Sequence, residues 1–366
     1  MKILYVITGL GLGGAEKQVI QLADEMKLMG HEIFLVSLVG CATLLPQNDI
    51  TVYQLEMKKN IISFVLSIIK LKHIIKKIKP DVVHSHMFHA NIFSRITRLI
   101  VKFPKLICTA HSCNEGGRLR MFLYRITDRL ATLSTNVSME AVDNFISKGA
   151  STKDRMIVVY NGIDTDLFKF SLEDRISGRE ELGITDNSPI LLSVGRFTEA
   201  KDYPNLLEMF SLLIKKYTHD LEPVLYIAGD GELLPSIKKY AVELGISDKV
   251  TFLGVRNDIR KLMCAADVFI LSSEWEGFAL VVAEAMACEL LVVATDCGGV
   301  KEVVGGLGGL APVKDPAYLA CKTNKLLKMY NDEKEQREKL GRKDILERYS
   351  LKIAVNKWLA IYQNSQ

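Results

Sequence analysis

Short apolar runs alternate with longer amphipathic stretches over most of the chain. Several runs are apolar from end to end, which is typical of strands buried on both faces of a parallel sheet. The candidate strands are Lys2–Thr8, Glu32–Leu38, Val82–His84, Leu106–Ala110, Leu130–Ser134, Met156–Val159, Pro189–Val194, Val224–Ala228, Val250–Phe252, Val268–Leu271 and Leu291–Ala294. Strands that alternate with helices of roughly ten or more residues form βαβ units. The pattern therefore predicts an α/β fold with parallel sheets.

A polar stretch over residues 164–188 interrupts this alternation, and the series of strands begins again after it. A chain of 366 residues is too long for one comfortable core and suits two domains. We therefore expect Rossmann-like domains over residues 1–167 and 168–349, and a final helix, about Lys352–Tyr362, within residues 350–366. Doubly wound domains bind ligands at the carboxyl ends of their strands, so two facing domains would form a cleft there.

The composition excludes several classes of protein. Apolar residues make up 48% and charged residues 25% of the chain, which is ordinary for a folded protein and excludes disorder. Seven cysteines without a CxxC spacing argue against a disulfide framework or a zinc site and favour a reduced, cytoplasmic setting. We expect no signal peptide, because the N-terminus lacks a basic start, an apolar run and a small-residue cleavage site. We expect no spanning helix, because no uninterrupted apolar run reaches roughly 18 residues.

The charge of the chain is unevenly distributed. Its net charge is +4, to which residues 1–165 contribute +8 and residues 166–366 contribute −4. Seven lysines and no acid lie from Lys58 to Lys79 among isoleucines and leucines, and Arg118–Arg129 is a second basic run with aromatic residues. This pattern indicates binding to an anionic membrane surface, while a packed helix with a basic edge is the structural alternative. Nucleic acid, the other anionic partner, lacks a recognisable binding motif here.

Residues 9–14 fit GxGxxG between a strand and a helix, which is the context of a dinucleotide site. A nicotinamide site also needs an acidic residue at the end of the second strand, where Val36–Gly40 has none. Two interpretations remain open. The glycines make a tight turn, or Gly13, Gly14 and Glu16 bring a helix N-terminus to a phosphate or sugar oxygen.

Two cations follow a strand end in the second half of the chain. Gly195-Arg196 ends the strand, and Lys201 follows five residues after Arg196. Arginine can bind phosphate oxygens with two hydrogen bonds and lysine adds a point charge, so the pair predicts a diphosphate site, with a solvated surface pair as the alternative. Ala228–Glu232 closes another strand and by itself predicts only a turn with a helix cap.

The most specific stretch is Ser272–Glu284, where a strand gives way to a loop and to a helix expected to begin near Phe278. With Glu276 at the mouth of this helix and Glu284 two turns into it, the carboxylates would lie about 12 Å apart on one face. That separation suits opposite ends of a nucleotide-sugar and exceeds that of a hydrolase acid/base pair. The amides around Gly277 and Phe278 can hold phosphate oxygens.

These motifs together resemble the GT-B glycosyltransferases of family GT4. The shared features, in the family's order, are Gly13-Gly14-Ala15-Glu16, Asn161-Gly162-Ile163-Asp164, Gly195-Arg196 with Lys201, and Glu276 with Glu284. The resemblance covers nearly the whole chain and is to bacterial transferases that build O-antigen, capsule, lipopolysaccharide and other surface polysaccharides. It implies retaining transfer of a hexose or N-acetylhexosamine from a nucleotide-sugar, with UDP preferred and GDP-mannose as the alternative, and without a metal or other cofactor.

The resemblance also implies a partner and a location. We expect a saccharide acceptor carried on a polyprenyl diphosphate, because the basic N-terminal half suits the anionic inner face of the cell membrane. The last helix of such enzymes crosses back to the N-terminal domain, which would explain its place after the last strand.

The resemblance assigns roles by position. His111, Glu276, Arg196 and Lys201 are the expected catalytic groups, with Glu276 as a positioning group for a dissociative reaction. The expected donor contacts are Gly14, Gly195, Arg196, Lys201, Gly229, Leu253, Val255, Glu276, Gly277, Phe278, Ala279, Leu280 and Glu284. The expected acceptor contacts are Gly13, Glu16, His84, His86 and His111.

Several alternatives remain open. His84, His86 and His89 cluster after a strand, where a metal, an acceptor or a structural role would each use them. Asp164-Thr165-Asp166 spells DxD, the manganese motif of the other large transferase fold. A sugar-nucleotide epimerase of the same architecture and a binding module that has lost catalysis are the alternative functions.

Overall fold

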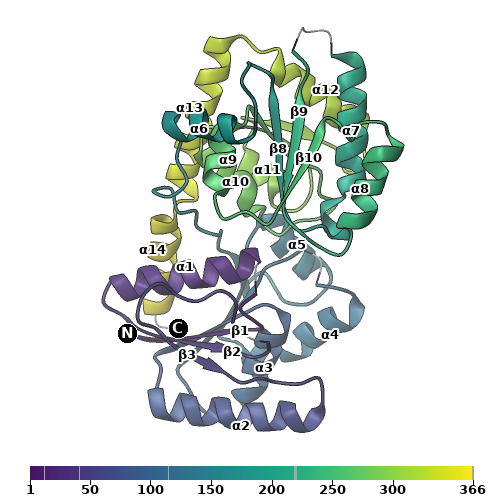
Figure 1. Ribbon diagram of the computed structural model, residues 1–366. Coiled ribbons are helices and arrows are strands. Elements are labelled where there is room, and N and C mark those ends of the chain that lie inside the picture. Colours follow the sequence, from purple (N-terminus) through teal and green to yellow (C-terminus); the bar gives the residue numbers. More distant parts are fainter. Residues whose placement is uncertain (12, 41, 114, 218–220, 365–366) are drawn as a thin grey trace. The chain divides into compact units, whose positions relative to one another are not determined.

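The computed structural model describes residues 1–11, 13–40, 42–113, 115–217 and 221–364. The chain folds into two compact units (Figure 1). Unit 1 comprises Met1–Gly162 together with the C-terminal segment from Leu351, and unit 2 comprises Ile163–Ser350. The division after Gly162 falls slightly earlier in the chain than the boundary expected after residue 167.

Unit 1 is built on a parallel sheet of seven strands in the order β3-β2-β1-β4-β5-β6-β7. Its strands are β1 Lys2–Ile7, β2 Glu32–Ser37, β3 Thr51–Gln54, β4 Val82–His86, β5 Lys105–Ala110, β6 Leu133–Asn136 and β7 Met156–Val158. Its helices are α1 Gly14–Leu28, α2 Ile61–Ile78, α3 Phe88–Thr97, α4 Arg118–Thr127, the 3₁₀ turn η1 Asp128–Leu130, α5 Met139–Ser147 and α14 Leu351–Gln363. The strand order reverses between β1 and β4, which makes that point the ligand-binding edge of a doubly wound sheet.

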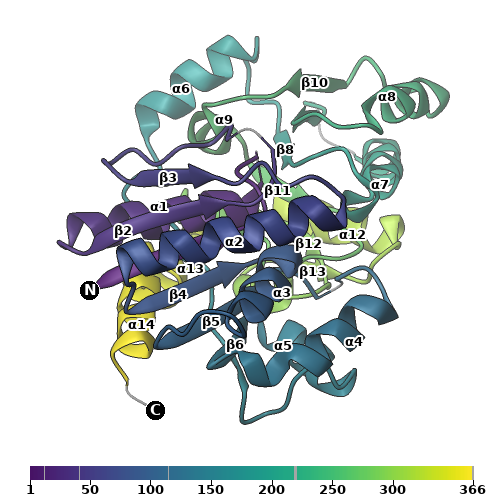
Figure 2. The ribbon, with the colours of Figure 1, turned by 90° about the horizontal axis from the view of Figure 1, so that it is seen from below.

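Helices cover both faces of this sheet. Figure 1 and Figure 2 show α1 and α14 on the face opposite to α2. The last helix buries Leu351, Val355, Trp358 and Tyr362 on one side, and these side chains pack in one cluster with Tyr5 of β1. Their spacing of three to four residues is that of a helix with one apolar face. The C-terminal helix therefore completes the core of unit 1.

Unit 2 has a second parallel sheet, with the strand order β10-β9-β8-β11-β12-β13. Its strands are β8 Ile190–Val194, β9 Val224–Ala228, β10 Val250–Gly254, β11 Val268–Leu271, β12 Leu291–Thr295 and β13 Gly309–Ala311. Its helices are α6 Leu172–Glu181, η2 Glu199–Lys201, α7 Tyr203–Lys216, α8 Leu234–Glu243, α9 Ile259–Ala265, α10 Leu280–Ala287, α11 Val300–Val304, α12 Pro316–Leu327 and α13 Asn331–Arg348. Here the order reverses between β8 and β11.

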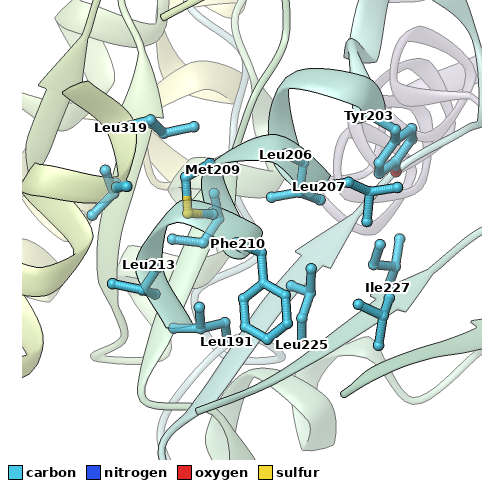
Figure 3. Packing of buried hydrophobic residues seen from close by; sticks show 14 of the residues in the cluster. Leu191, Tyr203, Leu206, Leu207, Met209, Phe210, Leu213, Leu225, Ile227 and Leu319 are labelled. Atoms are coloured by element: carbon cyan, nitrogen blue, oxygen red, sulfur yellow. The ribbon is translucent and has the colours of Figure 1, made fainter. Parts of the chain in front are cut away.

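The core of unit 2 lies between its sheet and α7 (Figure 3). Leu206, Phe210 and Leu213 face the sheet at helical spacing and pack in one cluster with Leu191 of β8 and Leu225 of β9. Burial of one such side chain stabilises the fold by about 2 kcal/mol. The N-terminus of α7 is capped by Asp202, whose carboxylate accepts from the amide of Asn205.

The prediction of two Rossmann-like domains with parallel sheets is confirmed. Three details are wrong. The sequence interpretation missed β3 and β13, which are four and three residues long. It placed a strand over Leu130–Ser134, whereas residues 128–130 form η1 and the strand is Leu133–Asn136.

No helix in the described part of the chain is long and apolar enough to cross a bilayer.

Candidate active site

In unit 2 the candidate residues gather at the point where the strand order reverses. β8 ends at Val194 and leads into Gly195 and Arg196, and the neighbouring β11 ends at Leu271 and leads into the loop before α10. Doubly wound sheets bind ligands in the crevice outside the carboxyl ends of the strands at such a point. Two segments that are far apart in sequence therefore meet at one edge of the sheet.

An ion pair joins the two loops. Lys201 Nζ donates to Glu276 Oε1 at 2.5 Å, and the Ser273 hydroxyl donates to the same oxygen at 2.8 Å. Both charged side chains are largely buried, with 21% of Lys201 and 14% of Glu276 exposed. The Ser272 hydroxyl also donates to the backbone oxygen of Lys201. Such a partly desolvated, charge-assisted contact is stronger than a surface ion pair.

Arg196 is the second cation at this edge, and its environment differs. Its side chain is exposed and forms no ion pair or hydrogen bond with any residue that the structure describes. The adjacent Gly195 is held firmly, since its amide donates to the oxygen of Ala228 and its oxygen accepts from the Tyr203 hydroxyl. Arg196 is thus an available cation on a fixed backbone.

Tyr203 was not found by sequence reasoning, although it supports this loop. Its ring stacks on Phe197 at a centroid distance of 4.2 Å. Burial raises the pKa of Tyr203, so the hydroxyl remains a hydrogen-bond donor to Gly195. The only local signal for Tyr203 was its position at the start of α7, and many residues with a structural role occupy such a position.

Gly229, after β9, packs directly against the Gly195 backbone. Its φ of +140° is accessible only to glycine, and a Cβ at this position would collide with the Gly195 carbonyl oxygen. The Gly229 amide donates to the oxygen of Gly254 at the end of β10. The glycine therefore lets the ends of β8, β9 and β10 approach one another closely.

The helix after β11 begins at Leu280, so the expectation of a start near Phe278 is wrong. Ala279 precedes it in a left-handed conformation, with φ of 61°. Glu276 consequently lies in the loop, and a separation of about 12 Å along one helix face does not apply to Glu276 and Glu284. Leu280 and Val281 carry the first helical amides, which no acceptor in the described part of the chain occupies.

The remaining predicted donor contacts differ in accessibility. Phe278 is buried and its ring packs on that of Tyr349, with the ring centroids 5.3 Å apart. Glu284 is also buried, at 8% exposed. Leu253 is half-buried and Val255 is exposed at the end of β10. Gly277 accepts from the amide of Gly299. Their roles toward a donor stay predictions.

In unit 1 the corresponding edge lies at the ends of β1 and β4. Gly13 is the N-cap of α1 and Gly14 its first residue, and Glu16 lies in the first turn with its side chain folded over Gly13. This is the arrangement that the sequence suggested for a helix N-terminus. Leu12, within the glycine motif, lies outside the described residues.

His84 and His86 do not follow a strand, as the sequence suggested, but lie inside β4. His84 is fully buried, with Nδ1 at 2.6 Å from the Tyr362 hydroxyl and Nε2 at 2.6 Å from the Thr109 hydroxyl. Burial holds the pKa of His84 well below its ordinary value. Both ring nitrogens are thus occupied, and an acceptor contact for His84 stays a prediction that its burial does not favour.

His86 and His111 form a pair at the carboxyl ends of β4 and β5. His86 Nδ1 lies 3.0 Å from His111 Nε2, and His86 is 1% exposed while His111 is partly exposed. Burial lowers the pKa of His111 to about 4 and that of His86 well below its ordinary value. Both rings are therefore neutral near pH 7.

Glu115 is a titratable group at the same edge that sequence reasoning missed. Its side chain is 9% exposed in the loop between β5 and α4, and burial raises its pKa to about 7. Arg120 donates to the Glu115 backbone oxygen and lies over the Phe88 ring. Two glycines with positive φ, Gly116 and Gly117, follow it. A carboxyl followed by Gly-Gly was the only local signal.

The DxD motif forms a turn. Asp164 Oδ1 accepts from the amides of Asp166 and Leu167, which is a common aspartate turn. In the described ranges no group of three metal-ligating side chains converges.

Comparisons with known proteins identify the family of the chain. The family described as Glycosyltransferase Family 4 matches residues 12–167, and that described as Glycosyl transferases group 1 matches residues 174–344. Together the two matches span most of the chain. N-acetyl-alpha-D-glucosaminyl L-malate synthase of Bacillus anthracis is 26% identical over 301 residues, which cover 80% of this chain and 77% of that protein.

The descriptions of two further similar proteins include a nucleotide-sugar or a nucleotide. UDP-Gal:alpha-D-GlcNAc-diphosphoundecaprenol alpha-1,3-galactosyltransferase of Escherichia coli is 29% identical over 247 residues, covering 64% of this chain and 62% of that protein. Anabaena HepE, solved in complex with UDP and glucose, superimposes with a TM-score of 0.88 at 23% identity and full coverage of both chains. The chain belongs to the family 4 glycosyltransferases and has the GT-B fold, which makes it a transferase of polysaccharide or glycoconjugate synthesis.

Proposed function

We propose that this transferase moves a hexose or N-acetylhexosamine from a UDP-sugar to a saccharide on a lipid diphosphate, with retention at the anomeric carbon. The observation that carries the donor site is the convergence, at one edge of unit 2, of exposed Arg196, the Lys201–Glu276 pair and the first amides of α10. Cations and helix N-termini are the groups that bind diphosphates in proteins. The UDP complex of HepE and the lipid diphosphate in the name of the E. coli relative support the choice of substrates.

The donor diphosphate would lie between Arg196 and the amides of Leu280 and Val281. Charge develops on the leaving diphosphate as the anomeric carbon becomes electron-poor, and fixed donors aimed at that charge lower the barrier. The acceptor hydroxyl would attack from the side on which the diphosphate leaves, and a phosphate oxygen would take its proton. Because the acceptor attacks the same face that the diphosphate leaves, the configuration at the anomeric carbon is retained.

Glu276 would act as a positioning group rather than as a nucleophile. One of its oxygens already accepts hydrogen bonds from Lys201 and Ser273, and such bonds lower the nucleophilicity of a carboxylate. The loop contact thus orients Glu276 toward the hexose while Lys201 stays near the phosphates.

We also propose that the reaction needs no metal, because Arg196, Lys201 and the helix amides supply the positive charge that a metal would bring. Turnover that is unchanged in excess chelator is the expected result. Loss of turnover in chelator, restored by manganese or magnesium, would show that the charge comes from a metal.

The donor is tested by incubating the chain with UDP-glucose, UDP-galactose, UDP-N-acetylglucosamine and GDP-mannose, with a polyprenyl-diphosphate saccharide as acceptor. We expect acceptor-dependent release of UDP and a product whose anomeric configuration matches the donor by NMR. Arg196→Ala should lower turnover about 100-fold, whereas Lys343→Ala, at an exposed position on α13, should leave it unchanged. Epimerised donor without acceptor, release of GDP only, or no turnover would favour one of the alternatives.

We further propose that unit 1 binds the anionic inner face of the cell membrane through α2 and α4. One side of α2 packs in the core through Ile68, Leu71, Ile75 and Ile78. Its other side exposes large apolar side chains among the lysines, namely Ile61, Ile62, Val65, Leu66 and Ile69. Exposed apolar side chains flanked by cations are typical of helices at a bilayer surface.

The arginine-rich α4 repeats this pattern. Leu119, Phe122 and Ile126 are each more than half exposed and lie on one helix face at intervals of three and four residues. Co-sedimentation with vesicles tests the proposal. We expect binding to vesicles with phosphatidylserine, weaker binding without it, and a large loss in Ile62→Ser/Leu66→Ser. The matched control is Leu346→Ser on α13, which is 39% exposed. Equal binding to both vesicle types would contradict the proposal.

A further inference from the structure

A cavity in unit 1 lies at the amino ends of β4 and β5. Its volume is about 480 Å³, and it opens between the C-terminal end of α2 and the segment that links α3 to β5. Small-molecule sites in proteins are commonly of this size. The six residues of β5, at about 3.3 Å each, put roughly 20 Å between this cavity and the carboxyl ends of the strands. The cavity is therefore separate from the candidate active site.

The buried part of the lining is apolar and held in place. Ile75, Val101 and Phe103 line the cavity and belong to the core cluster that α2 shares with β4 and β5. The Arg98 guanidinium lies over the Phe103 ring and donates to the Pro104 oxygen, which fixes the segment before β5. The cavity thus exists before any ligand arrives.

The exposed part of the lining is cationic. Its lysines are Lys76, Lys79 and Lys102, and all three are exposed. Their side chains form no ion pair or hydrogen bond with any residue that the structure describes. Asp81 also lines the cavity, and its carboxylate accepts a hydrogen bond from the amide of Lys2. Three cations beside one carboxylate favour an anionic ligand.

Lys79 has a backbone conformation that lysine rarely adopts. It is the C-cap of α2, with φ of 52° and ψ of 62°, in the left-handed region where glycine is the usual residue at a helix end. Pro80 follows it, and a residue before proline favours extended backbone. A lysine at this position therefore costs backbone energy that glycine would not, and such costs are common where a side chain serves a ligand.

The cationic rim continues the exposed apolar side of α2. Lys76 follows Ile69 and Ile62 at intervals of seven residues, which is about two helical turns, so the three side chains lie on one side of the helix. Ile62 and Ile69 are both exposed. The cavity thus lies at the end of the surface through which α2 is proposed to contact the membrane.

We propose that this cavity binds one anionic phospholipid, with its phosphate at the three lysines and the first part of an acyl chain against the apolar lining. An amphiphile fits both parts of the lining, because a free anion would leave Val101 and Phe103 uncovered and a neutral lipid would leave the lysines without a counter-charge. The bound lipid is an anchor rather than the sugar acceptor, since the cavity lies at the opposite ends of the strands. The membrane as its source rests on the proposed function, whereas the binding of a single lipid does not.

Binding of a single lipid is measured by calorimetry on the full chain with dihexanoyl phosphatidylglycerol, a short-chain lipid used below its micelle threshold. We expect it to bind at least about tenfold more tightly than dihexanoyl phosphatidylcholine, which has no net charge, or glycerophosphoglycerol, which lacks the acyl chains. No binding, or equal binding of the neutral lipid, would overturn the proposal. Equal binding of glycerophosphoglycerol would identify a site for free phosphate esters and overturn the assignment to a lipid.

Three variants separate this cavity from the general charge of unit 1. Lys76→Ala and Lys79→Gly should each weaken binding of the short-chain lipid about tenfold. Lys77→Ala is the matched control, because it removes the same charge from an exposed residue of α2 outside the lining, and it should not change binding. Lys79→Gly should not lower the denaturant midpoint, since glycine accepts the left-handed backbone, so its loss of binding would not come from unfolding. Equal losses in all three variants would indicate diffuse electrostatic attraction and overturn the proposal.

Vesicles decide the source of the lipid. If the short-chain lipid binds and vesicles containing phosphatidylglycerol do not, the proposed membrane contact fails while the cavity remains a lipid site. Vesicle binding without any binding of the short-chain lipid, retained in full by Lys79→Gly, would support the membrane contact and overturn the lipid site.

Discussion

Lys201 Nζ lies 2.5 Å from Glu276 Oε1, so a cation expected on the donor diphosphate already neutralises the carboxylate expected beside the hexose. The two side chains come from η2 and from the loop after β11, 75 residues apart in sequence. An ion pair of this kind fixes both loops before a ligand arrives. The diphosphate would then meet exposed Arg196 first, with Lys201 shared between the phosphate and Glu276.

Lys201 and Glu276 should therefore behave as one unit in catalysis. Lys201→Met and Glu276→Gln should each lower kcat/KM about 100-fold, because either change removes the ion pair between the two side chains. The double variant should lose much less than the product of the two single losses. Steady-state kinetics of all four proteins measures this coupling. Losses that multiply would mean that the two residues act independently.

Gly229→Ala should displace the loop that carries Arg196. The added Cβ would collide with the Gly195 carbonyl oxygen at a φ of +140°, so we expect a loss of about 2–4 kcal/mol in the unfolding free energy and much weaker binding of UDP. Denaturant unfolding and calorimetry with UDP measure the two effects. Gly245→Ala is the control, because its φ is also positive, at +70°, but no atom lies within 4 Å of the added Cβ. Equal effects in the two variants would exclude the steric cause.

The strands that sequence analysis found are those buried on both faces. β11 is an uninterrupted apolar run, and β1 and β8 are apolar except for Lys2 and Ser193, because helices cover both faces of each sheet. β3 was missed because its residues are half-exposed and mixed in polarity, and β13 because it contains only Gly309–Ala311. The histidines of β4 looked like a loop, since nothing nearby in sequence shows that Tyr362 and Thr109 bond to His84 or that His111 bonds to His86.

The grouping of the candidate residues could be predicted where it depends on strand ends, but not where it depends on contacts between distant segments. Arg196, Lys201 and Glu276 were found because each follows a strand that local sequence predicts. Their ion pair was not, because its members lie on separate loops. The start of α10 was misplaced because Ala279 adopts a left-handed φ of 61°, which alanine rarely does and which the local sequence does not signal.

Tyr362→Phe, a change on α14, should lower the stability of unit 1. The hydroxyl bonds to His84 Nδ1 at 2.6 Å and to the Tyr5 hydroxyl at 3.3 Å, so its removal leaves a buried nitrogen without a partner. We expect a loss of about 1–3 kcal/mol in unfolding free energy. Tyr330→Phe, at a position that is 85% exposed, is the matched control and should be neutral. Indistinguishable denaturation midpoints for the two variants would show that the buried hydroxyl contributes nothing.

Glu115→Gln should change how stability depends on pH. Burial raises the pKa of Glu115 from 4.5 to about 7, so between these values the folded protein holds a proton that the unfolded chain releases. Stability therefore falls as pH rises through this window, by at most about 3 kcal/mol above pH 7. Glutamine has no proton to lose, so the variant should match the wild type near pH 4.5 and exceed it in stability at pH 8. Glu173→Gln, at an exposed position on α6, should give no such pH-dependent difference. Denaturant midpoints measured across this pH range test the prediction. A difference in midpoint between Glu115→Gln and the wild type that does not change with pH would mean that the Glu115 carboxyl is not desolvated.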